Sequence, residues 1–234
     1  MLCSVELQMA DAFTLPDRLA LDDLSTYLGR AARIEDGSVR LIGGGGVLAV
    51  YVAVLYPSGL LDVSPTILGL RTFAIAEREE FDAVVPVASL LMRIEMAKTQ
   101  VTDASAAVTL SLPMRVNTVT WAAISPPRGG WSRLEPVSSD LLNRVGRSGI
   151  EEVAAAVPTG TGEQIVRRVR NEVWGRPIRG AETLPAGVGF ASVTLGFLPP
   201  EIEQLAVFET GAWSRVSTKR GHVLVKQRGW SLGR

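Results

Sequence analysis

The feature that most constrains the fold is an uncharged stretch between residues 41 and 61. It is long enough to cross a bilayer as a helix. However, the glycine run Gly43–Gly46 lies near its start, and Pro57 and Gly59 interrupt its end. Its middle, Val47–Tyr56, is rich in β-branched and aromatic side chains, which is typical of a buried strand. The stretch therefore predicts a strand between two turns, and not a membrane span.

Further strands are predicted on both sides of this one, at Val39–Ile42 and Thr66–Ala76. The connections are too short for helical crossovers, so we expect antiparallel pairing. Val47–Tyr56 is apolar on both faces and is predicted to be central and covered on both sides. The other elements expected in this half are helices at 16–34 and 87–98 and strands at 106–112 and 117–124.

The segment Ser125–Trp131, with two prolines and two glycines, marks the clearest boundary in the chain. We expect two subdomains, 1–130 and 131–234, which could share one core. The predicted fold class is α+β: an N-terminal antiparallel sheet with covering helices, then a three-helix segment and a C-terminal β-hairpin, in the element order of a winged helix. The later elements are helices at 139–157, 162–174 and 184–198 and strands at 204–209, 213–218 and 222–227.

Composition narrows the compartment and the partners. Apolar residues make up 47% of the chain, and 24 basic residues balance 24 acidic ones, so no global field favours nucleic acid or a membrane. Arginine greatly outnumbers lysine, as in proteins from GC-rich genomes such as actinobacterial ones. The single cysteine, Cys3, allows no disulfide within one chain, and the N-terminus does not resemble a signal peptide. A cytoplasmic location is expected.

No pattern in the sequence marks a catalytic, metal or cofactor site. His222 is the only histidine, and one histidine with the distant Cys3 cannot supply a zinc or non-haem iron site. Gly43–Gly46 is followed by a predicted strand and not by Lys-Ser/Thr and a helix, so it is no phosphate loop. No Gly-x-Ser-x-Gly elbow supports a triad built on His222. We therefore expect no catalytic residue, no metal and no cofactor.

Basic residues gather in the C-terminal part, and no acidic residue follows Gly211. They could contact an anion or nucleic acid. The predicted helix 184–198, however, carries none of the Arg, Lys, Asn or Gln side chains that read bases. The candidate contacts are Arg167, Arg168, Arg170, Arg215, Lys219, Arg220 and His222.

The boundary segment offers a second candidate site. Arg128 and Trp131 could form a rigid docking loop, because loops often carry binding residues. Alternatively, the segment is a linker whose Trp131 packs back on the core.

These observations leave three function classes open. The working hypothesis is a non-enzymatic cytoplasmic protein-interaction or regulatory protein. The alternatives are a winged-helix DNA-binding regulator and a metal-independent enzyme that acts on a small anionic metabolite. The expected partner is a protein; nucleic acid and a second copy of the chain stay open, and a membrane is not expected.

Overall fold

A computed structural model describes residues 12–34, 37–59, 62–117, 119–158 and 160–227. Its central feature is one eight-stranded antiparallel sheet. The strands are β2 (Ser38–Gly44), β3 (Val47–Leu55), β4 (Thr66–Ala74), β5 (Phe81–Pro86), β7 (Ser132–Ser138), β10 (Gln204–Thr210), β11 (Trp213–Thr218) and β12 (Gly221–Lys226). Their order across the sheet is β5-β2-β3-β4-β12-β11-β10-β7.

The two halves of the sheet mirror each other about the β4–β12 pair. Each half contains a three-strand meander, β2-β3-β4 or β10-β11-β12, whose last strand lies at the centre. A fourth strand, β5 or β7, pairs on the outer side of each meander. The central pair runs from His222 opposite Leu70 to Lys226 opposite Thr66. Residues far apart in the sequence therefore form the middle of the sheet.

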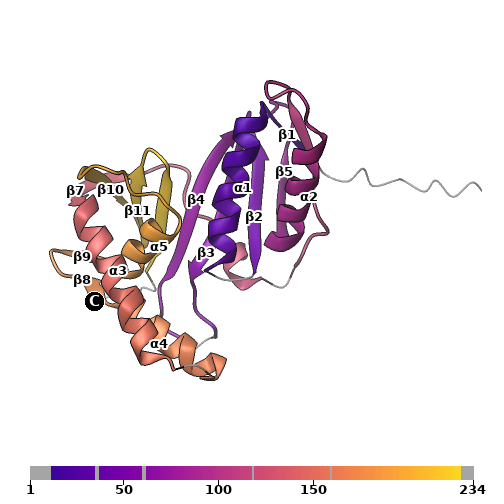
Figure 1. Cartoon of the computed structure of the whole chain (residues 1–234). Helices are drawn as coiled ribbons and strands as arrows, with labels where there is room; N and C mark the ends of the chain where they lie inside the picture. Colours follow the sequence, from indigo (N-terminus) through magenta and orange to yellow (C-terminus); the bar gives the residue numbers. More distant parts are fainter. Residues whose placement is uncertain (1–11, 35–36, 60–61, 118, 159, 228–234) are drawn as a thin grey trace, which may run out of the picture.

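Helices cover one face of this sheet (Figure 1). They are α1 (Arg18–Ala32), α2 (Val87–Gln100), α3 (Ser139–Ala156) and α5 (Gly187–Thr194). Their inward side chains and alternate residues of the strands form one hydrophobic core. The core is continuous across the halves, because Tyr27 of α1 stacks on Phe197 with 5.8 Å between ring centroids. Gly69 of β4 lies beneath, where an added Cβ would overlap Leu195 and lie 3.1 Å from the Tyr27 hydroxyl.

The opposite face of the sheet carries a smaller apolar cluster. The short helix η1 (Thr120–Ala123) places Trp121 against Leu68, Trp213 and Leu224. Arg40 of β2 ties this segment to the sheet: its guanidinium donates to the Ala122 carbonyl at 2.7 Å and to Asp82 of β5 at 2.6 Å. The buried and half-buried residues of β3 alternate, so only one face of that strand is fully covered.

The remaining elements lie beside the large sheet. β1 (Ala12–Leu15) pairs with β6 (Val108–Ser111) in a two-stranded antiparallel sheet. β8 (Pro177–Ile178) pairs with β9 (Ala181–Pro185). The helix α4 (Glu163–Gly175) follows α3 and lies at the lower end of the molecule in Figure 1.

The predicted fold class was wrong about how the elements assemble. The C-terminal strands do not form the wing of a winged helix; they complete the sheet that β2–β5 begin. The predicted helix 184–198 is split into β9 and α5, and the predicted strand 117–124 contains η1 instead. The strands β5 and β7 of the large sheet were missed. In contrast, the antiparallel meander β2–β4, the helices α1, α2 and α3 and the three tail strands are confirmed.

Candidate functional site

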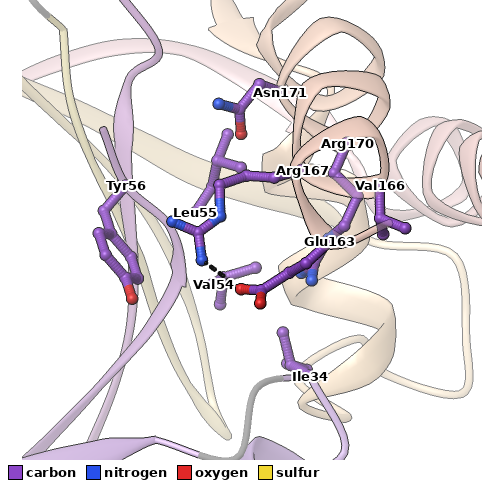
Figure 2. Close-up of a pocket in the computed structure, with 9 residues that line it drawn as sticks. All are labelled: Ile34, Val54, Leu55, Tyr56, Glu163, Val166, Arg167, Arg170 and Asn171. Atoms are coloured by element: carbon purple, nitrogen blue, oxygen red, sulfur yellow. Dashed lines mark hydrogen bonds and ion pairs between the residues drawn. The ribbon is translucent and has the colours of Figure 1, made fainter. Parts of the chain in front are cut away.

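Two of the predicted basic residues line a pocket of about 200 Å³ between α4 and the end of β3 (Figure 2). Arg167 and Arg170 extend from α4, and Val54 and Leu55 come from β3. Ile34, which follows α1, completes the apolar part of the wall. The pocket therefore combines an apolar lining with a basic rim. Arg168 is exposed on α4 and does not line it.

The polar groups of this pocket already have partners within the chain. Arg167 donates to Glu163 at 2.8 Å, an exposed pair one helical turn apart. Asn171 donates its side-chain N–H to the Asp62 carboxylate at 3.0 Å. An anion would have to displace Glu163 to reach Arg167, so the pocket is not preformed for one.

Asp62 fixes the chain that leads from β3 into β4. Its carboxylate accepts the main-chain N–H groups of Ser58 and Ser64, both at 2.9 Å. Burial raises the pKa of Asp62, but the hydrogen bonds from Ser64 and Ser58 lower it by more, to about 2. The carboxylate is therefore ionised at neutral pH and holds this connection against α4 through Asn171.

The structure places Arg215, a candidate anion contact, beside Trp131 of the candidate docking loop. Arg215 of β11 lies between two aromatic rings, 4.5 Å from the centroid of Trp131 and 4.7 Å from that of Phe208. Its buried Nε has no hydrogen-bond partner among the residues that the structure describes. Burial lowers the pKa of Arg215. Trp131 also donates its indole N–H to the Pro127 carbonyl at 3.1 Å. Trp131 of the candidate docking loop thus packs on a candidate anion contact.

The other tail candidates lie around the β11–β12 turn. Lys219 is 3.6 Å from Glu203 with its side chain almost fully exposed. Arg220 is exposed, and its main-chain N–H is bonded to the Thr218 hydroxyl. His222 is 3.0 Å from the Ser217 hydroxyl, and burial, then the Arg215 charge, lowers the pKa of its imidazole.

The candidate residues therefore do not converge on one site. Arg167 and Arg170 line the pocket beside β3, whereas Lys219, Arg220 and His222 lie around the β11–β12 turn. Arg128 is exposed near Tyr51, where its charge lowers the pKa of that phenol, although burial, the larger effect, raises it.

Sequence reasoning missed a largely apolar concave surface, which we call the methionine groove. It lies between α2 and β6, has a volume of about 610 Å³ and is lined by residues of both elements. Met92, Met96 and Met114 are 66%, 62% and 87% exposed. Met92 and Met96 are four residues apart and share one side of α2, away from the buried Leu90 and Ile94. That spacing could have indicated the groove. Its lining is Ser89, Met92, Arg93, Met96, Ala97, Gln100, Thr109, Leu110, Ser111, Pro113 and Met114.

In the described ranges, no three or more His, Cys, Asp or Glu side chains are grouped so that they could hold a metal ion. No helix in the same ranges is both long and apolar enough to span a membrane. Cys3, which was considered as a partner for His222, lies outside the described residues.

Two family models match the sequence. Residues 9–114 match one described as "Domain of unknown function (DUF8010)", and residues 126–230 match one described as "Domain of unknown function (DUF8185)". Each model covers less than half of the chain, and neither description names an activity. No curated protein matches the sequence.

The solved structures that resemble this chain include bacterial sliding clamps. DNA polymerase III subunit beta from Borrelia burgdorferi, solved in complex with a natural product, matches 96% of this chain with a TM-score of 0.50 at 7% identity. The chain has the fold of a sliding clamp. This fold, a large antiparallel sheet with helices, replaces the winged-helix arrangement expected from the sequence.

Two further clamps give similar matches. The beta subunit of polymerase III from Caulobacter crescentus matches 93% of this chain with a TM-score of 0.48, and that from Pseudomonas aeruginosa matches 95% with 0.46, both at 12% identity. The chain spans 65% of the length of the C. crescentus protein and 66% of the B. burgdorferi and P. aeruginosa proteins. At 7% identity, the match to the B. burgdorferi protein establishes the fold alone.

Proposed function

We propose that this protein is a non-enzymatic scaffold that binds other proteins. The observation that carries the proposal is the methionine groove, in which Met92, Met96 and Met114 are all more than half exposed. Contiguous apolar surface of this kind marks interaction sites on soluble proteins. Methionine side chains are flexible and polarisable, so they adapt to the side chains of a partner.

The charges on the helices favour a protein partner over DNA. In each of α1, α2, α3 and α4, the numbers of basic and acidic residues differ by no more than one. Binding along a duplex requires many unopposed cations, because phosphate contacts supply most of the non-specific affinity. These four helices have no such excess of basic residues, which supports a scaffold for proteins.

Two other predictions accompany the proposal. The division into units 1–130 and 131–234 stays a prediction; separate expression of each segment and measurement of cooperative unfolding would test it. Enzymatic action on a small anionic metabolite is the rival function. Turnover of such a compound by the purified protein would replace the scaffold proposal.

Affinity capture with matched variants tests the scaffold function. The chain is immobilised and exposed to a lysate of its source cells, and retained proteins are quantified by mass spectrometry. The test variant is Met92→Glu with Met96→Glu. The control is Leu19→Glu with Ile202→Glu, which adds the same charge at two apolar positions that are 75% exposed and lie outside the groove.

We expect specific proteins to be retained by the wild type and by the control and to be lost from the groove variant. The same set of retained proteins on all three baits would refute the proposal.

A further inference from the structure

The hydrogen bonds of β1 show which way the main chain of β6 faces. Opposed residues in an antiparallel pair either exchange both main-chain hydrogen bonds or exchange none. Thr14 is opposite Thr109, and its N–H donates to Glu79 at 2.9 Å instead. The Thr14 and Thr109 hydroxyls are 3.1 Å apart, in line with the closer spacing of a pair that exchanges none. The N–H and C=O of Thr109 therefore point away from β1.

Ser111 faces the same way, because it lies two residues further along β6. Arg93 of α2 confirms this direction: its guanidinium donates to the Ser111 carbonyl at 3.3 Å and also contacts the Ser111 hydroxyl. No strand in the described ranges pairs with this edge. The outer edge of β6 thus presents the N–H and C=O of Thr109 and the N–H of Ser111.

The outer edges of β5, β7 and β1 are blocked. On β5, the carbonyls of Asp82 and Val84 already accept hydrogen bonds from the segment that follows β6, at 3.0 and 2.8 Å. β7 has Pro136, two exposed charged residues and an irregular register with β10, all of which oppose further pairing. The outer edge of β1 is occupied by Glu79. β6, with the sequence Val-Thr-Leu-Ser, has no proline and no charge.

The methionine groove lies along this open edge. Thr109 and Ser111 line the groove together with Met92 and Met96 of α2 and Met114. A strand added to β6 would point alternate side chains toward the groove and toward solvent. Apolar residues two apart in the added strand would then contact the methionines, and main-chain hydrogen bonds would join it to Thr109.

Charge selects the kind of strand that fits. Arg93 is the only charged residue in the lining, and it forms no ion pair with any described residue. A second copy of the chain that presented the same surface would bring another Arg93 and no carboxylate. A peptide with an acidic residue would supply the missing partner, and a carboxylate–guanidinium pair is a strong hydrogen-bonded contact.

We infer that the open edge of β6 binds an extended segment of a partner protein as an added β-strand, with apolar side chains in the methionine groove and an acidic side chain at Arg93. This inference rests on the proposed scaffold function and names the class of partner.

Selection from a displayed library of random peptides on the full chain tests the inference. We expect selected peptides to carry apolar residues two apart and one Asp or Glu. Thr109→Pro removes the outward N–H without touching the ladder to β1. This variant should bind a selected synthetic peptide at least about tenfold more weakly than the wild type does, because a buried carbonyl of the peptide loses its hydrogen-bond donor. Thr109→Val keeps the N–H and should bind as the wild type does.

Three further measurements complete the test. The Arg93→Glu variant should bind the acidic peptide about tenfold more weakly. A peptide with Lys in place of its Asp or Glu should recover binding to that variant. The amides of Thr109 and Ser111 should exchange hydrogen more slowly in the complex. N-methylation of the peptide amide that faces the Thr109 carbonyl should abolish binding, which tests the pairing even if the Thr109→Pro variant does not fold.

Several results would overturn the inference. One is a set of selected peptides with helical spacing that Thr109→Pro does not affect. Another is a dimer of the chain in sedimentation that Thr109→Pro dissociates. Failure to select any peptide would also overturn it. The lysate comparison with the Met92 and Met96 variants then still decides the scaffold function separately.

Discussion

Replacing Gly146 by Ala tests how closely α3 and α5 pack over the second half of the sheet. A Cβ on Gly146 would lie 2.6 Å from the carbonyl oxygen of Gly189 and 2.8 Å from Cγ2 of Val193. Conversely, a Cβ on Gly189 would lie 2.7 Å from the Leu142 carbonyl oxygen. The two helices therefore meet largely through their main chains at this glycine pair, and an added methyl group would meet main-chain atoms that cannot rotate away.

The expected cost follows from two opposing effects. Overpacking a well-packed core costs about 1–3 kcal/mol, and main-chain neighbours place this site at the upper end. Alanine in place of glycine stabilises a helix by about 1 kcal/mol, which offsets part of that cost. We expect Gly146→Ala to lower the free energy of unfolding by about 2 kcal/mol. For a chain of this size, that lowers the Tm by about 4–8 °C.

Thermal unfolding and urea titration measure the effect, with Gly29→Ala as the matched control. Gly29 lies in α1, and an added Cβ there meets nothing within 4 Å. That variant should gain up to about 1 kcal/mol. A Gly146→Ala variant as stable as the wild type would refute the close contact between α3 and α5.

Three other predictions concern the connections around the sheet. Arg40→Ala should speed amide hydrogen exchange in η1, because the guanidinium no longer tethers that segment; unchanged exchange would contradict this role. Because the pKa of Asp62 is about 2, below its ordinary value, its carboxylate stabilises the fold above about pH 4, and this contribution is lost as the pH falls toward 2. In the Asp62→Asn variant, the free energy of unfolding measured with urea should depend less on pH in that range. An unchanged pH profile would refute this role of Asp62. Trp174→Ala should cost about 3–5 kcal/mol in chemical denaturation, since this ring is 2% exposed and stacks on Phe190 at 4.3 Å; a loss below about 1 kcal/mol would contradict that packing.

Local patterns in the sequence predicted most elements but not their assembly. The β-branched and aromatic residues of segment 47–56 identified β3, and helical spacing identified α1 and α3. The pairing of β4 with β12 joins residues 66–70 to residues 222–226, and no local periodicity encodes such a contact. β7 was missed because it is a mostly exposed strand that contains a proline. The apolar run 184–198 resembled one helix, but α5 occupies only Gly187–Thr194 of it, and Gly196 adopts φ 71° just beyond.

Glycines in helices show what intrinsic propensity leaves out. By propensity alone, Gly146 and Gly149 weaken α3. In the structure both permit close contacts, with Gly189 and with the Trp174 ring. A single sequence gives the local cost of such a glycine but not the neighbour that requires it.

The candidate binding residues show the same limit. Arg215 and Trp131 were identified separately, and only the fold places the guanidinium on the indole ring. The methionine groove was missed because helical spacing predicts only the core-facing side of α2, and Met92 and Met96 lie on another side.

The two faces of the large sheet leave less free surface for a partner than the groove beside β6 does. Four helices occupy one face, and η1 and the Trp131–Arg215 stack cover part of the other. In the α4 pocket, Arg167 and Asn171 are already paired with Glu163 and Asp62. At β6, by contrast, outward main-chain groups, exposed methionines and an arginine without a carboxylate lie within one groove. A single added strand would pair the main-chain groups of this edge, cover the methionines and supply a carboxylate to Arg93.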